Sequence, residues 1–203
     1  MRFEPDSFSP HAFFDCLALA LRAPQPIAPF TITELHLFAY LACLLSVYEG
    51  EPVADWGYQF ALTGLGYPFS GELDSAMQAL TLRRHIEVDN LESVLPLDSA
   101  ALEMAKLEEI PSFKQRLRWL QTSLDCSLAM PVSVVKSAVV ARDDLSGAGV
   151  GGPRPLLSNA YVARVHGERE AIESALGGES SNLLAPAVAW LSMYILQGRE
   201  LAA

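Results

Sequence analysis

The stretch that decides the fold is TITELHLFAYLACLLSVYEGEP, residues 31–52. Thr31 and Glu34 have the spacing of a capping box, in which each side chain satisfies a free amide at the start of a helix. Gly50 and Pro52 are signals that end a helix. Apolar residues recur between these signals at helical intervals, at Leu35, Phe38, Leu41, Leu45 and Tyr48. The sequence therefore predicts an apolar helix that lies in the core of the protein.

Upstream of this stretch, residues 1–30 predict a helix over 7–22 and then a stiff connector. The connector contains Pro24, Pro26 and Pro29. Prolines this close together exclude a helix, because each lacks a backbone N–H and restricts the residue before it. We expect this N-terminal part to precede a domain that begins at the apolar helix.

Downstream, a short helix is predicted over 53–62, and a glycine-rich turn separates it from the next helix. Ser70 can cap that helix, which runs to Arg84 and carries acids in its first turn, where the helix dipole favours them. The period then changes, because residues 85–89 alternate between polar and apolar, which is typical of a strand. Residues 93–97 can return beside them, so the sequence predicts a small β-hairpin.

The helices after the hairpin have start signals of their own. Asp98 is expected to cap the first of them, with Leu97 and Leu102 forming a hydrophobic staple across its start. Ser112 and Gln115 have capping-box spacing and are expected to begin the second. Both segments lie in a predicted helical extension of the domain.

The last part of the chain gives mixed signals. Residues 132–141 and 160–166 each fit a strand or a helix, whereas 143–155 are rich in glycine and predict a flexible loop. The 14-residue apolar run at 183–196 predicts a buried helix, because a membrane span needs about 20 residues. The predicted segments are an N-terminal helix with its connector at 1–30, a domain at 31–97, a helical extension at 98–142, a loop at 143–155 and a C-terminal helical segment at 156–203.

The composition is that of a folded, acidic protein. Hydrophobic residues make up 51% of the chain and the net charge is -10, and such a chain repels nucleic-acid phosphates unless its basic residues cluster. The three cysteines are odd in number and widely spaced, which favours free thiols in a reducing compartment. The acidic start of the chain lacks the pattern of a secretion signal. We therefore expect a soluble, cytoplasmic protein without a membrane segment.

The order of elements between residues 31 and 97, which is helix, helix, turn, helix and hairpin, resembles the winged-helix family. The resemblance implies that the helix from Ser70 to Arg84 takes the place of the family's groove-reading helix and that residues 86–97 form the wing. The expected fold class is mainly α, with a winged-helix-like domain, a small β-hairpin and additional C-terminal helices. A generic helical domain with a hairpin is the alternative.

Charge argues against direct nucleic-acid binding by this domain. Residues 31–97 contain nine acids and two basic residues, Arg83 and Arg84. Glu72 and Asp74 open the candidate reading helix, where they would face the DNA phosphates. An acidic winged helix therefore fits a protein-docking role better than a DNA-reading one.

The same region resembles acidic winged-helix accessory subunits of bacterial chromosome-organising, SMC-like and defence ATPases, and the stretch from Gly50 to Pro52 before a helix is similar to them. The resemblance implies an adaptor that docks onto a larger protein, such as an ATPase subunit. One alternative is a DNA-binding transcriptional regulator in which Arg83, Arg84 and His85 touch the duplex. The other is an enzyme with an unrecognised site.

Aromatic residues gather around the glycine-rich turn. They can pack in the core, or they can form a protein-docking surface, because Trp and Tyr are common anchors at interfaces. The candidate partner-binding residues are Trp56, Tyr58, Phe60, Tyr67 and Phe69.

No sequence motif assigns a catalytic, cofactor-binding or metal-binding residue. The histidines and cysteines lack metal-ligand spacing, and the glycine-rich run at 147–152 lacks the Gly-Lys-Ser/Thr of a phosphate loop. The basic residues with the highest local density are predicted to lie on a solvated face, and they are Lys106, Lys114, Arg116 and Arg118. The sequence therefore favours a non-catalytic adaptor over an enzyme.

Overall fold

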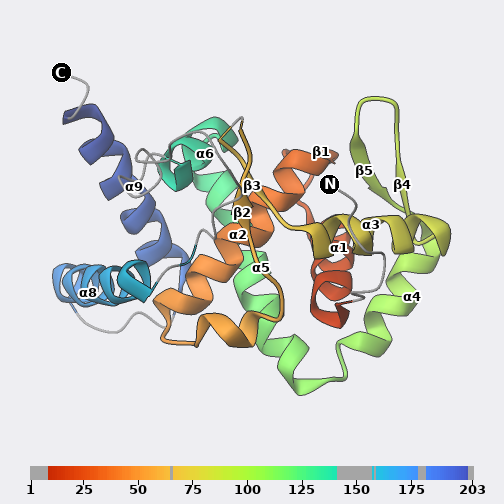
Figure 1. Ribbon diagram of the computed structural model, residues 1–203, viewed down its shortest axis with the longest axis horizontal. Helices are drawn as coiled ribbons and strands as arrows, with labels where there is room; N and C mark the ends of the chain where they lie inside the picture. Colours follow the sequence, from red (N-terminus) through yellow and green to blue (C-terminus); the bar gives the residue numbers. More distant parts are fainter. Residues whose placement is uncertain (1–8, 65, 141–156, 158, 178–181, 201–203) are drawn as a thin grey trace.

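The computed structural model describes residues 9–64, 66–140, 157, 159–177 and 182–200 (Figure 1). These residues are mainly helical, with small antiparallel sheets and additional C-terminal helices, as the sequence predicts. The elements in chain order are α1 Pro10–Arg22, β1 Phe30–Thr31, α2 Ile32–Tyr48, the short 3-10 helix η1 Val53–Trp56, β2 Ala61–Leu62, β3 Pro68–Phe69, α3 Gly71–Leu82, β4 Ile86–Val88, β5 Ser93–Pro96, α4 Asp98–Leu107, α5 Pro111–Ala129, α6 Val132–Val140, α8 Asn159–Leu176 and α9 Leu184–Glu200.

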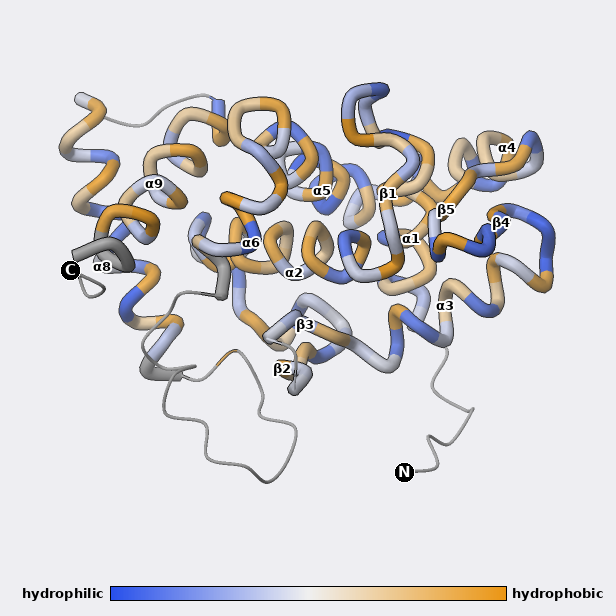
Figure 2. Tube along the Cα trace, turned by 90° about the horizontal axis from the view of Figure 1, so that it is seen from above, coloured by the Kyte–Doolittle hydropathy of each residue, from blue (hydrophilic) through white to orange (hydrophobic). Residues whose placement is uncertain are grey.

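Helix α2 forms the centre of the molecule, and its predicted start is confirmed. The amide of Thr31 donates to Glu34 Oε2 at 2.7 Å, and the amide of Glu34 donates to Thr31 Oγ1 at 3.3 Å, which completes the capping box. Every residue from Leu35 to Tyr48 is buried. Helices α8 and α9 lie at one end of the molecule, and α3, α4 and the β4–β5 hairpin lie at the other (Figures 1 and 2).

Helix α1 belongs to the same packed unit as the helices that follow it. Ser9 caps it by accepting the amide of Ala12 at 3.2 Å, and the helix packs against α2, α3, α4, α5 and β5. Phe30, in β1, pairs with Val94 in β5. The predicted boundary between residues 30 and 31 therefore does not separate two structural units, because the proline connector returns the chain to the sheet.

The predicted hairpin is confirmed and gains a third strand. Strands β4 and β5 pair antiparallel, with Val88 opposite Val94, and β1 adds to the outer side of β5, so that the order is β1-β5-β4. The carboxylate of Asp89 holds the turn by accepting the amides of Leu91 at 2.8 Å and Ser93 at 2.9 Å. A separate antiparallel pair, β2 and β3, encloses the glycine-rich turn.

The predicted helix over 53–62 is wrong beyond its first turn. Gly57 has φ +87° and ends η1. A Cβ atom at this position would lie 2.5 Å from His11 Nδ1, so both the backbone conformation and the close approach of α1 require glycine. The chain then extends into β2.

Two predicted helix starts are also wrong. Leu97 occupies the cap position of α4 and Asp98 is its first residue, while Leu102 is 67% exposed and forms no staple. Helix α5 begins at Pro111 with no side-chain cap, so Ser112 lies inside the first turn. Pro111 supplies the helical φ angle at the first position of α5, where its missing N–H costs nothing.

The C-terminal helices complete the core. Residues 132–140 and 160–166, which fit a strand or a helix by sequence, lie in α6 and α8. Helix α9 packs against α5, α6 and α8, and its Trp190 is buried against Tyr48 of α2, with ring centroids 5.6 Å apart. No helix in the described part of the chain is long and apolar enough to cross a membrane. The predicted loop at 143–155 lies outside the described residues.

Candidate functional site

A buried ion pair joins the first helix to the fifth. Asp15 of α1 is 0% exposed and Arg116 of α5 is 3% exposed. The Nε and Nη2 atoms of Arg116 donate to the two carboxylate oxygens of Asp15, the second at 2.6 Å, and the hydroxyl of Tyr58 also donates to this carboxylate. The predicted solvated face is therefore wrong for Arg116, whose charge is compensated inside the protein.

Aromatic rings enclose this ion pair. The guanidinium carbon of Arg116 lies 3.5 Å from the ring centroid of Trp56, within the range of a cation–π interaction. Burial and the negative charge of Asp15 raise the pKa of Tyr58 well above its ordinary value, so its hydroxyl stays a hydrogen-bond donor. Sequence reasoning could not find this cluster, because Asp15 and Arg116 lie 101 positions apart in the chain.

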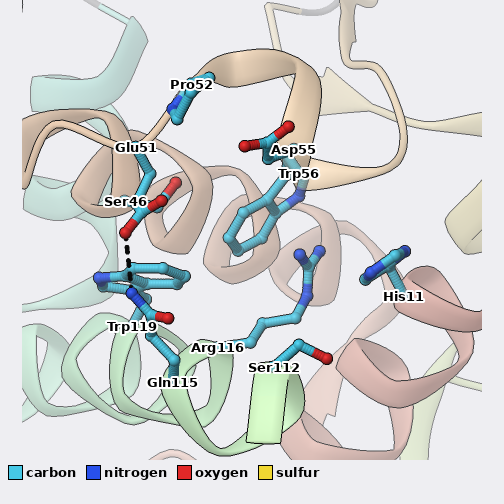
Figure 3. A pocket seen from close by; sticks show the side chains of 10 residues that line it. All are labelled: His11, Ser46, Glu51, Pro52, Asp55, Trp56, Ser112, Gln115, Arg116 and Trp119. Atoms are coloured by element: carbon cyan, nitrogen blue, oxygen red, sulfur yellow. Dashed lines mark hydrogen bonds between the residues drawn. The ribbon is translucent and has the colours of Figure 1, made fainter.

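A small pocket of about 140 Å³ lies beside the ion pair (Figure 3). In Figure 3, Trp56 and Asp55 of η1 face Arg116 and Gln115 of α5 across the pocket. Gln115 donates to Glu51 at 2.8 Å, so part of the polar lining is already paired. Sites for small molecules occupy about 300–1,000 Å³, and we therefore assign this cluster a structural role.

A larger groove of about 700 Å³ opens where the start of α2 meets the β2–β3 hairpin, the β4–β5 turn and α6. We call it the α2–α6 groove. Its volume falls within the range of about 300–1,000 Å³ that ligand sites occupy. Its lining combines apolar, aromatic and hydroxyl side chains with a few charges, and consists of Thr31, Ile32, Thr33, Glu34, His36, Leu37, Thr63, Tyr67, Pro68, Phe69, Glu92, Val132, Ser133 and Lys136.

His36 is the buried polar residue of the groove wall, at 3% exposure. The amide of Ser70, the cap residue of α3, donates to His36 Nδ1 at 3.2 Å, so the ring proton of the neutral imidazole is on Nε2. Burial lowers the pKa of His36 to about 4, which keeps the ring neutral at neutral pH. Among the described residues, Nε2 is buried and has no hydrogen-bond partner.

The charges of the groove come from different sides. Lys136 of α6 lies with its Nζ 3.6 Å from the ring centroid of Tyr67. Glu92 comes from the β4–β5 turn and is exposed, whereas the carboxylate of Glu34 is committed to the capping box. Helix α6 and the β4–β5 hairpin lie on either side of the start of α2 (Figures 1 and 2). The groove therefore has a basic side and an acidic side.

The structure divides the five aromatic residues of the predicted docking surface. Trp56, Tyr58 and Phe60 are buried, and this part of the prediction is wrong because they pack around the ion pair and against α2. Tyr67 and Phe69 are half-buried and line the α2–α6 groove. The ring of Phe69 stacks on His36, with centroids 4.9 Å apart.

The three residues of the DNA-binding alternative lie at the end of α3. Arg83 and Arg84 are exposed, and the guanidinium of Arg83 lies 5.3 Å from the ring of Phe13 in α1. His85 Nδ1 lies 3.0 Å from the hydroxyl of Ser99. The first turn of α3 carries Glu72 and Asp74, so the two ends of this helix present opposite charges.

Metal and nucleophile chemistry have little support in the described part of the chain. It holds no group of three or more His, Cys, Asp or Glu side chains placed to bind a metal ion. Cys16, Cys43 and Cys126 are buried free thiols, and burial raises the pKa of Cys126 to about 12, so this thiol is not a ready nucleophile.

Comparison of the chain with protein-family models, with curated proteins and with solved structures finds no match.

Proposed function

We propose that the protein is a non-catalytic accessory subunit that docks onto a larger protein through the α2–α6 groove. The observation that carries this proposal is the groove itself, which combines half-buried aromatic rings with apolar side chains and a few charges. An interface core of this kind is typical of protein recognition, because aromatic anchors and a few fixed polar groups supply affinity and orientation.

The winged-helix resemblance of residues 31–97 supports the same proposal. Over these residues the elements are β1, α2, η1, β2, β3, α3, β4 and β5, so the helix before the hairpin is present, but only the first turn of the expected helix over 53–62 forms. Glu72 and Asp74 at the start of α3 favour a protein partner over DNA, since they would repel phosphates. The resemblance to accessory subunits of SMC-like and defence ATPases suggests an ATPase subunit as the partner. Three buried free thiols support a cytoplasmic location.

Recovery of the partner from the native host tests the proposal. The tagged full chain, its Tyr67→Ala variant and a Leu128→Ala control are each crosslinked in cells and purified. Leu128 is 52% exposed on α5 and lies outside the groove lining. We expect one larger protein with the wild type and the control and its loss with Tyr67→Ala. Equal recovery by all three proteins would overturn the proposal.

A further inference from the structure

We propose that the protein forms a two-fold dimer in which the outer face of α9 packs against the same face of a second copy. This dimer goes beyond docking through the α2–α6 groove, because the described residues of α9 are absent from the lining of that groove. The burial pattern of α9 and the charge of the chain both favour this arrangement.

Helix α9 has two faces that differ in burial. One face packs into the core and contains Ala187, Trp190 and Tyr194, which are buried. The opposite side, which we call the outer face, is exposed at Ala185 and Leu196 and half-buried at the positions between them. Its members share one side of the helix because they recur at intervals of three or four residues. The outer face consists of Ala185, Val188, Ala189, Ser192, Met193 and Leu196.

The outer face is apolar along about three turns of the helix. Its hydroxyl, on Ser192, is committed to its own helix, since it donates to the carbonyl of Val188 at 2.8 Å. Leu196 is 61% exposed, and α9 lies at one end of the molecule (Figures 1 and 2). A helix that is apolar on all sides is normally covered on all sides, so the contiguous apolar surface of the outer face indicates an interaction site.

Charge favours a second copy as the cover of the outer face. Each chain carries a net charge of -10, so two copies repel each other unless they meet through an uncharged surface. The run at 183–196 contains no charged residue. In a two-fold interface the same patch meets itself, and the outer face then brings no like charges together and leaves the Ser192 hydroxyl bonded within its own helix.

Other covers fit the outer face less well. A different protein is distinguished from its competitors by complementary charges or hydrogen bonds. The outer face offers neither, whereas a second copy presents an identical uncharged surface. A membrane surface is also disfavoured, because helices that lie on membranes carry Lys or Arg on the side opposite the apolar one, and that side of α9 is packed in the core.

Analytical ultracentrifugation of the full chain at several concentrations tests for the dimer. We expect a species of twice the chain mass whose fraction rises with concentration. Leu196→Glu places like charges at the interface and should raise the dissociation constant at least about tenfold. Leu102→Glu is the matched control and should leave it unchanged, since Leu102 is 67% exposed on α4, at the other end of the molecule (Figure 1). A wild-type chain that stays monomeric up to about 1 mM, the range of very weak complexes, would overturn the proposal.

Chemical crosslinking locates the interface on α9. Ser192→Cys and the control Ser137→Cys on α6 replace equivalent hydroxyls, each of which donates to the carbonyl four residues earlier at 2.8 Å. The three native cysteines are buried, so a short bis-maleimide should react mainly with the introduced thiol. We expect covalent dimers with Ser192→Cys and none with Ser137→Cys. A dimer that Leu196→Glu leaves intact, or that Ser192→Cys does not crosslink, would overturn the assignment of the interface to α9.

Discussion

Polar groups are buried both at the Asp15–Arg116 ion pair and in the wall of the α2–α6 groove. The two regions differ in whether those groups have hydrogen-bond partners. The carboxylate of Asp15 receives donors from Arg116 and Tyr58, all within the chain. His36 is buried to a similar degree, yet its Nε2 has no acceptor among the described residues. Paired burial joins elements of the fold, whereas a buried donor without an acceptor is unfavourable for the fold.

The largest expected effect concerns the buried ion pair of Asp15 and Arg116. Asp15→Asn removes the negative charge and leaves Arg116 buried, so it should lower the free energy of unfolding by about 3–5 kcal/mol, measured by urea denaturation. The double replacement of Asp15 and Arg116 by leucine removes both charges and should cost much less. A loss below about 1 kcal/mol for Asp15→Asn would mean that this pair contributes no more than an exposed ion pair does. The contrast between paired and unpaired buried groups would then be wrong.

The second effect is the dependence of stability on pH that the buried His36 causes. The folded-state pKa of His36 is about 4 against an ordinary value of 6.5, so between these values the unfolded chain binds a proton that the folded chain does not. The free energy of unfolding should therefore fall by roughly 3 kcal/mol as the pH drops from 6.5 to 4. His36→Asn keeps an acceptor for the Ser70 amide and should lack this part of the slope. An unchanged slope in thermal unfolding would contradict the assignment.

A smaller effect separates the stability of α2 from the chemistry of the groove. Thr31→Ala removes the side chain that accepts the Glu34 amide and should lower the free energy of unfolding by about 1 kcal/mol. Thr33→Ala is the matched control, because Thr33 lines the same groove but does not occupy the cap. Its effect should stay within about 0.5 kcal/mol, and equal losses in chemical denaturation would show that the cap is not the cause.

The smallest expected effect concerns the half-buried Lys136 of the groove. Lys136→Ala removes the contact with the Tyr67 ring and should lower the free energy of unfolding by about 0.5–1 kcal/mol, measured by chemical denaturation. Lys114→Ala, at an exposed position of α5, should change it less. If Lys136→Ala instead cost as much as Asp15→Asn, the groove side chains would be part of the core and the comparison would fail.

Local signals in the sequence predicted most of the helices and the hairpin. The capping box of α2 and the Ser70 cap of α3 are confirmed, because each depends on atoms that are three residues apart. The same reasoning failed at Leu102 and at Ser112, where a cap or staple pattern was present but packing and Pro111 decided the helix start. A short pattern shows what a segment can do alone, and neighbouring segments decide whether it does so.

Of the candidate docking residues, the sequence identified Tyr67 and Phe69 and missed His36 and Lys136. By sequence, His36 is one more position of an apolar helix, and the Ser70 amide, 34 residues away, and the Phe69 ring hold its imidazole in place. Lys136 reaches the groove because α6, which packs against α5 and α9, lines it together with the start of α2. Both depend on contacts between distant segments, which composition and periodicity do not encode.

The sequence by itself determined that the chain is acidic and mainly helical and that an apolar helix begins after Thr31, since charge and local hydrogen bonds are properties of short segments. Only the tertiary structure decided that Arg116 is buried with Asp15 and that His36 Nε2 is buried without a partner among the described residues. The physical reason is that burial and pairing of a polar group depend on which distant side chains the fold places around it.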